Sequence, residues 1–365
     1  MVEHTSDYEW RGEGDAAEVV LYAPDDRLAG SSFGRILPVT QLPGVESPVY
    51  AAASPEGFGW VAASSSHAAP DLVSIPVRGL LLVADAPATS LGVEAERVPD
   101  LISRNLSEVR LPALTGAVMR GICETGAVGA AGHGLIEEED LALFLPPMLG
   151  DPDALGRRAL AAGMRDWETR PGEPDVRVVG EVLDVEDAET LGLQPGTLAL
   201  VVSVGAGDLG RLALAGHRER ILGRVRGGDL GAEEDLPAAP APSEEAADLL
   251  SAIYAAANFA DGRAALLLYA LRRAIGAAAG GLDVRAAWRV GGMEERDGFP
   301  LHRGNLAAAN RGEVLVSGGN LVAGTGKMCA SVPPFGAPED DGRHPWEEAG
   351  LLERWAVLDP PEGKS

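Results

Sequence analysis

The segment from residue 193 to residue 210, LQPGTLALVVSVGAGDLG, restricts the fold of this chain more than any other stretch. Residues Thr197–Val204 are almost wholly apolar and partly β-branched, which is typical of a strand buried on both faces. The sequence GAGDLG follows at once, and a helical pattern continues over residues 211–222. We therefore predict a central buried strand, a glycine turn, and a helix that packs on the sheet of that strand.

The GAGDLG turn has more than one interpretation. A dinucleotide-binding G-x-G-x-x-G turn opens a βαβ unit, and its second strand ends in an acidic residue about 20 residues later. Here the helix is followed by RVRGGDLGAEEDLPAAPAP, which contains no strand pattern. The turn is otherwise a tight one where backbones pack closely, or a helix N-terminus whose N–H groups face an anion.

Strands and helices are mixed along the chain without strict βαβ alternation, which predicts an α+β (mixed α/β) fold. We expect one large domain over residues 18–332, with buried mixed sheets and packed helices. The acidic residues 1–17 are predicted to form a mobile tail. Residues 333–365 are predicted to form an acidic, proline-rich tail with one short helix.

Other segments carry weaker patterns. Strands are expected at residues 18–23, 57–63, 72–84, 176–185, 284–289 and 312–317, with VRGLLLVA (residues 77–84) apolar enough to be central. Helices are expected at residues 98–110 and 137–145, joined by the glycine-rich residues 116–134, and at residues 153–164, capped by Asp153. Residues 235–242 are expected to be a linker or a long loop. Ser243 is expected to cap a helix, and helical pattern resumes at Arg263.

Composition limits the partners of this protein. The formal net charge is −25, and all but two of the basic residues are arginines. An acidic surface of this kind argues against general binding of DNA or of anionic membranes. The two cysteines, the polar N-terminus and the absence of an 18-residue apolar run predict a cytoplasmic protein. The most basic window is RERILGRVR (residues 218–226), and such a run is usually a solvated face.

Residues 196–210 resemble the segment of RtcB-type RNA ligases in which a buried strand ends in a metal-binding histidine before Cys-Gly-Ser-Arg-Gly-Leu-Gly. Further segments fall in the family's order: Leu42-Pro43-Gly44 with Pro48, residues 55–59 (PEGFG), residues 255–260 (AAANFA) with Arg263, His302-Arg303-Gly304, and residues 312–319. Together they cover roughly residues 35–330. The resemblance implies an RtcB-like domain. The family's reaction is the GTP- and manganese-dependent joining of RNA 3′-phosphate or 2′,3′-cyclic phosphate ends to 5′-hydroxyl ends.

The chain departs from the family at the residues that carry this chemistry. Positions that hold manganese in the family are matched by Val77, Ser203 and Trp288, which offer neither imidazole nor thiolate. Gly207 stands in place of the arginine of the glycine turn. The motif with the guanylylated histidine is missing, and His344 is the only late histidine. The resemblance therefore implies an inactive paralogue without catalytic residues, metal ligands or a bound cofactor.

Anion binding is the function that the resemblance leaves in place. The candidate nucleotide- or phosphate-binding residues are Gly205, Gly207, Gly210, Asn258, His302, Arg303 and Lys327. His217 is a candidate for a phosphate contact or for a surface role. The implied partners are RNA ends or a guanine nucleotide, and an active RtcB-type ligase or an archease-like protein. Two alternatives stay open: an active RNA ligase or phosphate-handling enzyme with a rebuilt site, and a nucleotide-cofactor oxidoreductase that uses GAGDLG.

Overall fold

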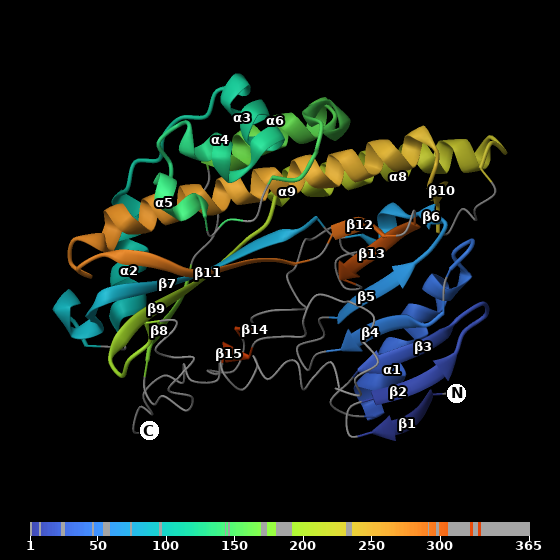
Figure 1. The fold of residues 1–365 in the computed structure, drawn as a ribbon, viewed down its shortest axis with the longest axis horizontal. Helices are drawn as coiled ribbons and strands as arrows, with labels where there is room; N and C mark the ends of the chain where they lie inside the picture. Colours follow the sequence, from blue (N-terminus) through green and yellow to red (C-terminus); the bar gives the residue numbers. More distant parts are fainter. Residues whose placement is uncertain are drawn as a thin grey trace.

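The protein has an α+β fold in which long helices lie over two β-sheets (Figure 1). It is described here from a computed structural model. The structure describes residues 2–6, 9–22, 26–45, 47–53, 59–73, 75–94, 97–142, 144, 147–168, 174–179, 192–230, 236–290, 292–296, 299–305, 322–323 and 328–329. The predicted strand at residues 312–317 and the predicted C-terminal tail lie outside this range.

The four-stranded sheet contains the apolar strand that precedes the glycine turn. Its order is β11 (Leu282–Val290), β7 (Val77–Pro87), β9 (Thr197–Val204) and β8 (Asp175–Val178), and all its pairs are antiparallel. Both predicted central strands, β7 and β9, are interior and confirmed. On β9, Leu198, Leu200 and Val202 belong to the main hydrophobic core, while Ala199, on the opposite face, is also fully buried. An apolar run without alternation therefore became a strand buried on both sides.

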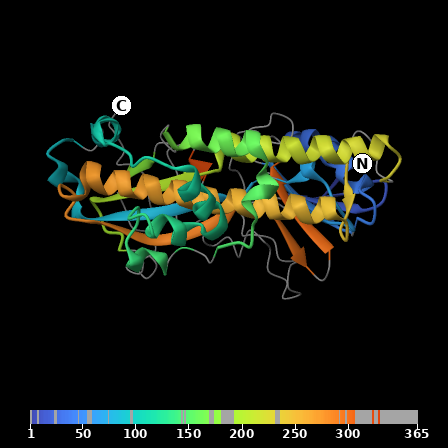
Figure 2. The same ribbon diagram turned by 90° about the horizontal axis from the view of Figure 1, so that it is seen from above.

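Helix α9 (Glu244–Leu271) packs on β7 and β9, on the face of this sheet that belongs to the main core. Figure 2 shows α8 (Gly207–Arg226) side by side with α9, and the two helices contact each other. Ser243 caps α9 as predicted, because its hydroxyl accepts a hydrogen bond from the N–H of Ala246. The helix runs through Arg263 without a break and ends in one π-helical segment, Arg272–Gly276. Its alanine- and leucine-rich sequence is buried almost all round, so no polar stripe marks its path.

The segment between β7 and β8 is mainly helical. It contains α2 (Val98–Glu108), α3 (Gly116–Thr125), α4 (Ala127–Ala131), α5 (Glu138–Leu141) and α6 (Arg157–Glu168), with single-turn 3₁₀ helices at Ala88–Leu91 and Pro152–Leu155. Another 3₁₀ turn, Pro70–Leu72, precedes β7. The glycine-rich residues 116–134 were wrongly expected to be a connection. Tertiary packing made them helical, since Met119, Ile122 and Cys123 are buried on one face of α3. Asp151, not Asp153, is the capping residue of the 3₁₀ turn before α6.

The seven-stranded sheet corrects the prediction for the N-terminus. Its order is β1 (Val2–Ser6), β2 (Glu9–Glu13), β3 (Glu18–Tyr22), β4 (Val49–Ala53), β5 (Gly59–Ser64), β13 (Phe299–Asn305) and β12 (Gly292–Arg296). Only β3 and β4 pair in parallel among the described strands of this sheet. Residues 1–17 are thus not a structureless tail, because β1 and β2 form an antiparallel pair that extends the sheet at β3. Backbone hydrogen bonds hold these two strands together, and the acidic side-chain composition of the segment gives no indication of such bonds.

A second, smaller hydrophobic core lies at this sheet. It joins Val19 and Leu21 of β3 to Phe33 and Ile36 of α1 (Asp26–Ile36) and to the 3₁₀ helix Leu37–Gln41. The predicted linker at residues 235–242 includes β10 (Ala239–Pro240), which pairs with β6 (His67–Ala68). The remaining described pair is β14 (Val322–Ala323) with β15 (Met328–Cys329).

Candidate functional site

The positions that the resemblance assigns to metal ligands meet in the four-stranded sheet. Gly79 on β7 pairs with Ser203 of β9 on one side and with Trp288 of β11 on the other. Ser203 and Trp288 therefore lie in one row across the sheet, separated by one strand. Val77 lies two residues along β7 and pairs with Val290. The backbone thus brings the three positions together, but neither valine nor tryptophan supplies a metal ligand.

The glycine turn after β9 is held by internal partners. Nη1 of Arg263, from α9, donates to the carbonyl oxygen of Gly205 over 2.6 Å. The N–H of Leu209, in the first turn of α8, donates to Oδ2 of Asp166 over 3.2 Å. The turn is therefore enclosed by side chains of α6 and α9 that the sequence pattern did not identify, because both come from distant parts of the chain.

Close packing explains why glycines occupy this turn. Gly207 has a φ of +61°, and a Cβ there would lie 2.7 Å from Oδ2 of Asp166 and 3.0 Å from Nη1 of Arg263. A Cβ on Gly210 would lie 2.7 Å from Cγ1 of Ile75. The tight-turn interpretation is therefore the one that the contacts support.

Asn258 is a buried structural residue whose side-chain amide connects backbone groups of separate segments. It is fully buried on α9, and its Oδ1 accepts the N–H of Met148 over 2.9 Å. Its Nδ2 lies 2.9, 3.2 and 2.8 Å from the carbonyl oxygens of Cys123, Glu124 and Met148. These contacts occupy both N–H donors of the amide, which are the groups that a phosphate would need, so the geometry disfavours the predicted phosphate contact at Asn258.

His302 and Arg303 lie in the strand β13. Their backbone positions pair with Met293 and Gly292 of β12 on one side and with Ala63 and Ala62 of β5 on the other. The glycine turn and Asn258, in contrast, belong to the elements over the four-stranded sheet. Lys327 and His344 lie outside the described residues. Within the described chain, the predicted anion-binding residues are thus divided between two sheets.

A buried ion pair lies between β7 and α9. Nε of Arg78 donates to Oδ1 of Asp261 over 2.7 Å, and both side chains are at most 1 % exposed. The Arg78 guanidinium also lies 5.2 Å from the centre of the Phe144 ring. The sequence carries two signals of this pair: an arginine inside an apolar strand and an aspartate inside an apolar helix. Neither signal shows with which residue the charged side chain pairs.

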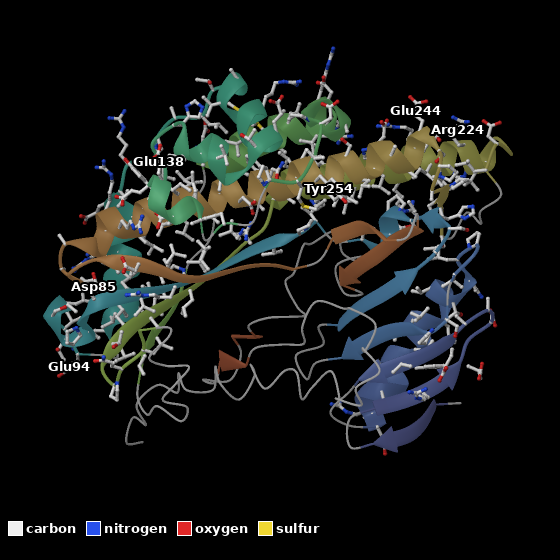
Figure 3. All side chains as sticks on the ribbon, viewed as in Figure 1. Asp85, Glu94, Glu138, Arg224, Glu244 and Tyr254 are labelled. Atoms are coloured by element: carbon white, nitrogen blue, oxygen red, sulfur yellow. The ribbon has the colours of Figure 1, made fainter. Side chains whose placement is uncertain are left out.

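The basic window on α8 is neutralised by carboxylates. Arg218 pairs with Asp71, Arg220 pairs with Asp248, and Arg224 pairs with both Asp229 and Glu245. Figure 3 shows Arg224 at the end of α8, beside the start of α9 where Glu244 is labelled. These arginines hold α8 against its neighbours, which leaves little cationic surface for a nucleic acid.

Two further titratable groups are buried. His217 on α8 is 1 % exposed, and its Nε2 lies 2.9 Å from the carbonyl oxygen of Ala154. Burial lowers the pKa of His217, while the hydrogen bond to Ala154 opposes this shift. Burial raises the pKa of the Cys123 thiol to about 12, which keeps it protonated and unreactive at neutral pH. His217 is therefore a structural residue and not a surface residue.

The described residues contain no group of three or more histidine, cysteine, aspartate or glutamate side chains arranged to hold a metal ion. Within the same part of the chain, no helix is both long and apolar enough to cross a membrane. The sequence matches no protein-family model and no curated protein.

Proposed function

We propose that this protein is an RtcB-like paralogue that binds RNA ends or a guanine nucleotide without ligating RNA. The observation that carries the proposal is the register of the four-stranded sheet. The positions matched to the family's metal ligands include Ser203 and Trp288, which flank Gly79 in one row. A collinear set of motifs whose key positions also meet in space supports the resemblance more strongly than the motifs alone.

The residues at those positions argue against the family's reaction. Guanylylation needs an imidazole that attacks the α-phosphate, with cations that bridge the phosphate oxygens as charge develops. Val77 and Trp288 have no side-chain group that binds Mn²⁺, and the hydroxyl of Ser203 is a poor substitute for imidazole. Binding without chemistry is the activity that such a site retains.

The geometry disfavours a dinucleotide-dependent oxidoreductase. A dinucleotide site lies where a strand of a parallel sheet meets the helix that follows it. Both neighbours of β9 are antiparallel to it. The N–H of Leu209, which would face a pyrophosphate, already donates to Asp166.

Incubation with labelled GTP and Mn²⁺ followed by a denaturing gel tests the proposal. We expect no labelled protein band, and no joining of RNA 2′,3′-cyclic phosphate ends to 5′-hydroxyl ends. A labelled band that disappears in the His344→Ala variant would instead identify an active ligase with a rebuilt site.

A second arm measures binding. A fluorescent RNA with a 2′,3′-cyclic phosphate end should bind weakly, with an affinity that falls as salt is raised. The double variant His302→Ala/Arg303→Ala should bind less tightly, whereas the control Arg224→Ala should not, because Arg224 is neutralised by Asp229 and Glu245. If neither RNA nor GTP binds the wild-type protein, the proposal is wrong, and a protein partner becomes the expectation to pursue.

A further inference from the structure

The start of α8 has the electrostatic properties of an anion site. An α-helix leaves its first N–H groups without partners inside the helix and carries a partial positive charge at that end. Helix α8 is 20 residues long and begins at Gly207 directly after the buried strand β9. These features attract an anion, but they do not by themselves make a site.

Arg263 supplies the second feature. Its side chain is only 7 % exposed, and Nη1 lies 3.0 Å from the position of a Cβ on Gly207. Nη1 donates to the carbonyl oxygen of Gly205, while Nε has no hydrogen-bond acceptor among the residues that the structure describes. A guanidinium taken out of water is costly unless an anion compensates it. A negative charge next to Arg263 would therefore stabilise its buried guanidinium.

Asp166 provides that charge from α6. Its Oδ2 accepts the N–H of Leu209 and lies 2.7 Å from the Cβ position on Gly207. Burial lowers the pKa of Arg263, and the charge of Asp166 opposes this shift. A carboxylate at a helix N-terminus beside an arginine reproduces the contacts that a bound phosphate makes.

We infer that the start of α8 is an oxyanion site that the protein fills with its own Asp166 carboxylate, and that this carboxylate excludes phosphate from the glycine turn. The ligand that fits the vacated site is a small oxyanion, for which inorganic phosphate is the probe. Asp166 is half-buried, so we expect phosphate to reach the site from solvent once the carboxylate is removed. The inference stands apart from the proposed function, because phosphate binding by a variant requires neither RNA nor guanylylation.

The test compares Asp166→Ala with Asp208→Ala. Asp208 lies in the first turn of the same helix, is about half exposed and pairs with Arg211, so its removal changes the charge near the turn without opening the site. Thermal unfolding is measured against inorganic phosphate at ionic strength held constant with sodium chloride. We expect a saturable rise in Tm for Asp166→Ala, with an apparent phosphate affinity about tenfold or more above that of Asp208→Ala, as one gained charge-assisted contact predicts. The wild-type protein should show no such rise.

Arg263→Met in the Asp166→Ala background should abolish the response to phosphate. Equal responses of Asp166→Ala and Asp208→Ala, or a response that survives Arg263→Met, would overturn the inference. If Asp166→Ala does not fold, Asp166→Ser is measured in the same way. If neither variant folds alone, inorganic phosphate in the refolding buffer should restore folded protein, and failure to do so also counts against the site.

Discussion

Asn258 connects three segments through a single buried amide. Its partners are backbone groups of Cys123 and Glu124 on α3 and of Met148 in the segment before α6. Truncation removes the partner of one buried carbonyl group, that of Cys123, and of partly buried backbone groups of Glu124 and Met148. A buried group left without a partner costs roughly 1–3 kcal/mol. We predict that Asn258→Ala lowers the free energy of unfolding by about 2–4 kcal/mol, measured by urea denaturation.

Asn105 is the matched control for this prediction. It lies on α2, is half-buried and donates to the carbonyl oxygen of Ala274 over 3.2 Å, without the other contacts that Asn258 makes. Asn105→Ala should cost about 1 kcal/mol or less. Equal losses of unfolding free energy in the two variants would contradict the role of Asn258 in connecting these segments.

His217 makes stability depend on pH. Its folded-state pKa lies below the ordinary value of 6.5, so the unfolded chain binds a proton more readily than the native protein does. This contribution is fully present above about pH 6.5 and is lost as pH falls from there through the lower folded-state pKa. We predict that the wild-type protein loses more free energy of unfolding between about pH 7.5 and about pH 5.5 than the His217→Gln variant does. Urea unfolding measures both losses, at pH values about one unit above and below the ordinary histidine pKa. A pH dependence that is the same in both proteins would show that His217 does not titrate in this way.

At the scale of the element, α8 contains two kinds of glycine. Gly210 packs against Ile75, and an added Cβ would lie 2.7 Å from Cγ1 of that buried side chain. Gly216 lies six positions later in the same helix, is exposed, and an added Cβ would meet no atom within 4 Å. We predict that Gly210→Ala destabilises the protein by about 1–3 kcal/mol through overpacking. Gly216→Ala should stabilise it by up to about 1 kcal/mol, because alanine favours the helix.

Thermal denaturation of both variants beside wild type measures this contrast. The expected result is a lower Tm for Gly210→Ala and a higher Tm for Gly216→Ala. A gain in stability for Gly210→Ala would mean that α8 does not approach the segment before β7 as closely as the contacts indicate.

At the scale of the whole molecule, α9 joins the main parts of the fold. It packs on β7 and β9 of the four-stranded sheet and also contacts β12 of the seven-stranded sheet. The chain itself passes from the first sheet to the second between β11 and β12 (Figure 1). The polar side chains buried along α9, Asn258, Asp261 and Arg263, each bind a different segment, which fixes how those segments meet on one helix.

The net charge of the chain is consistent with arginines that pair with carboxylates of the same protein. The chain carries 30 basic and 55 acidic residues. Among the described residues, the arginines of the most basic window pair with carboxylates of α9 and of neighbouring segments. Any RNA that the protein binds must therefore be held by local groups and not by a general positive field.

Local patterns in the sequence were enough to predict several elements. The apolar run of β9, the central position of β7 and the Ser243 cap of α9 were all predicted and are all present. Each depends on neighbouring residues: β-branched apolar runs favour buried strands, and a serine before acidic residues favours a helix start. The pairing of β1 with β2 and the helices α3 and α4 were missed, because packing and backbone pairing outweighed composition there.

What only the tertiary structure decided is the set of partners around the glycine turn. The motif GAGDLG occurs both in nucleotide sites and in tight turns, and the absence of a following strand pattern already weighed against the nucleotide site. The choice depends on Asp166, which lies 43 residues before Leu209, and on Arg263, which lies 58 residues after Gly205. The sequence by itself determined that a buried strand would lead through glycines into a helix, because strand and helix preferences are local. Which charge meets the start of that helix depends on the path of the whole chain, so only the fold could decide it.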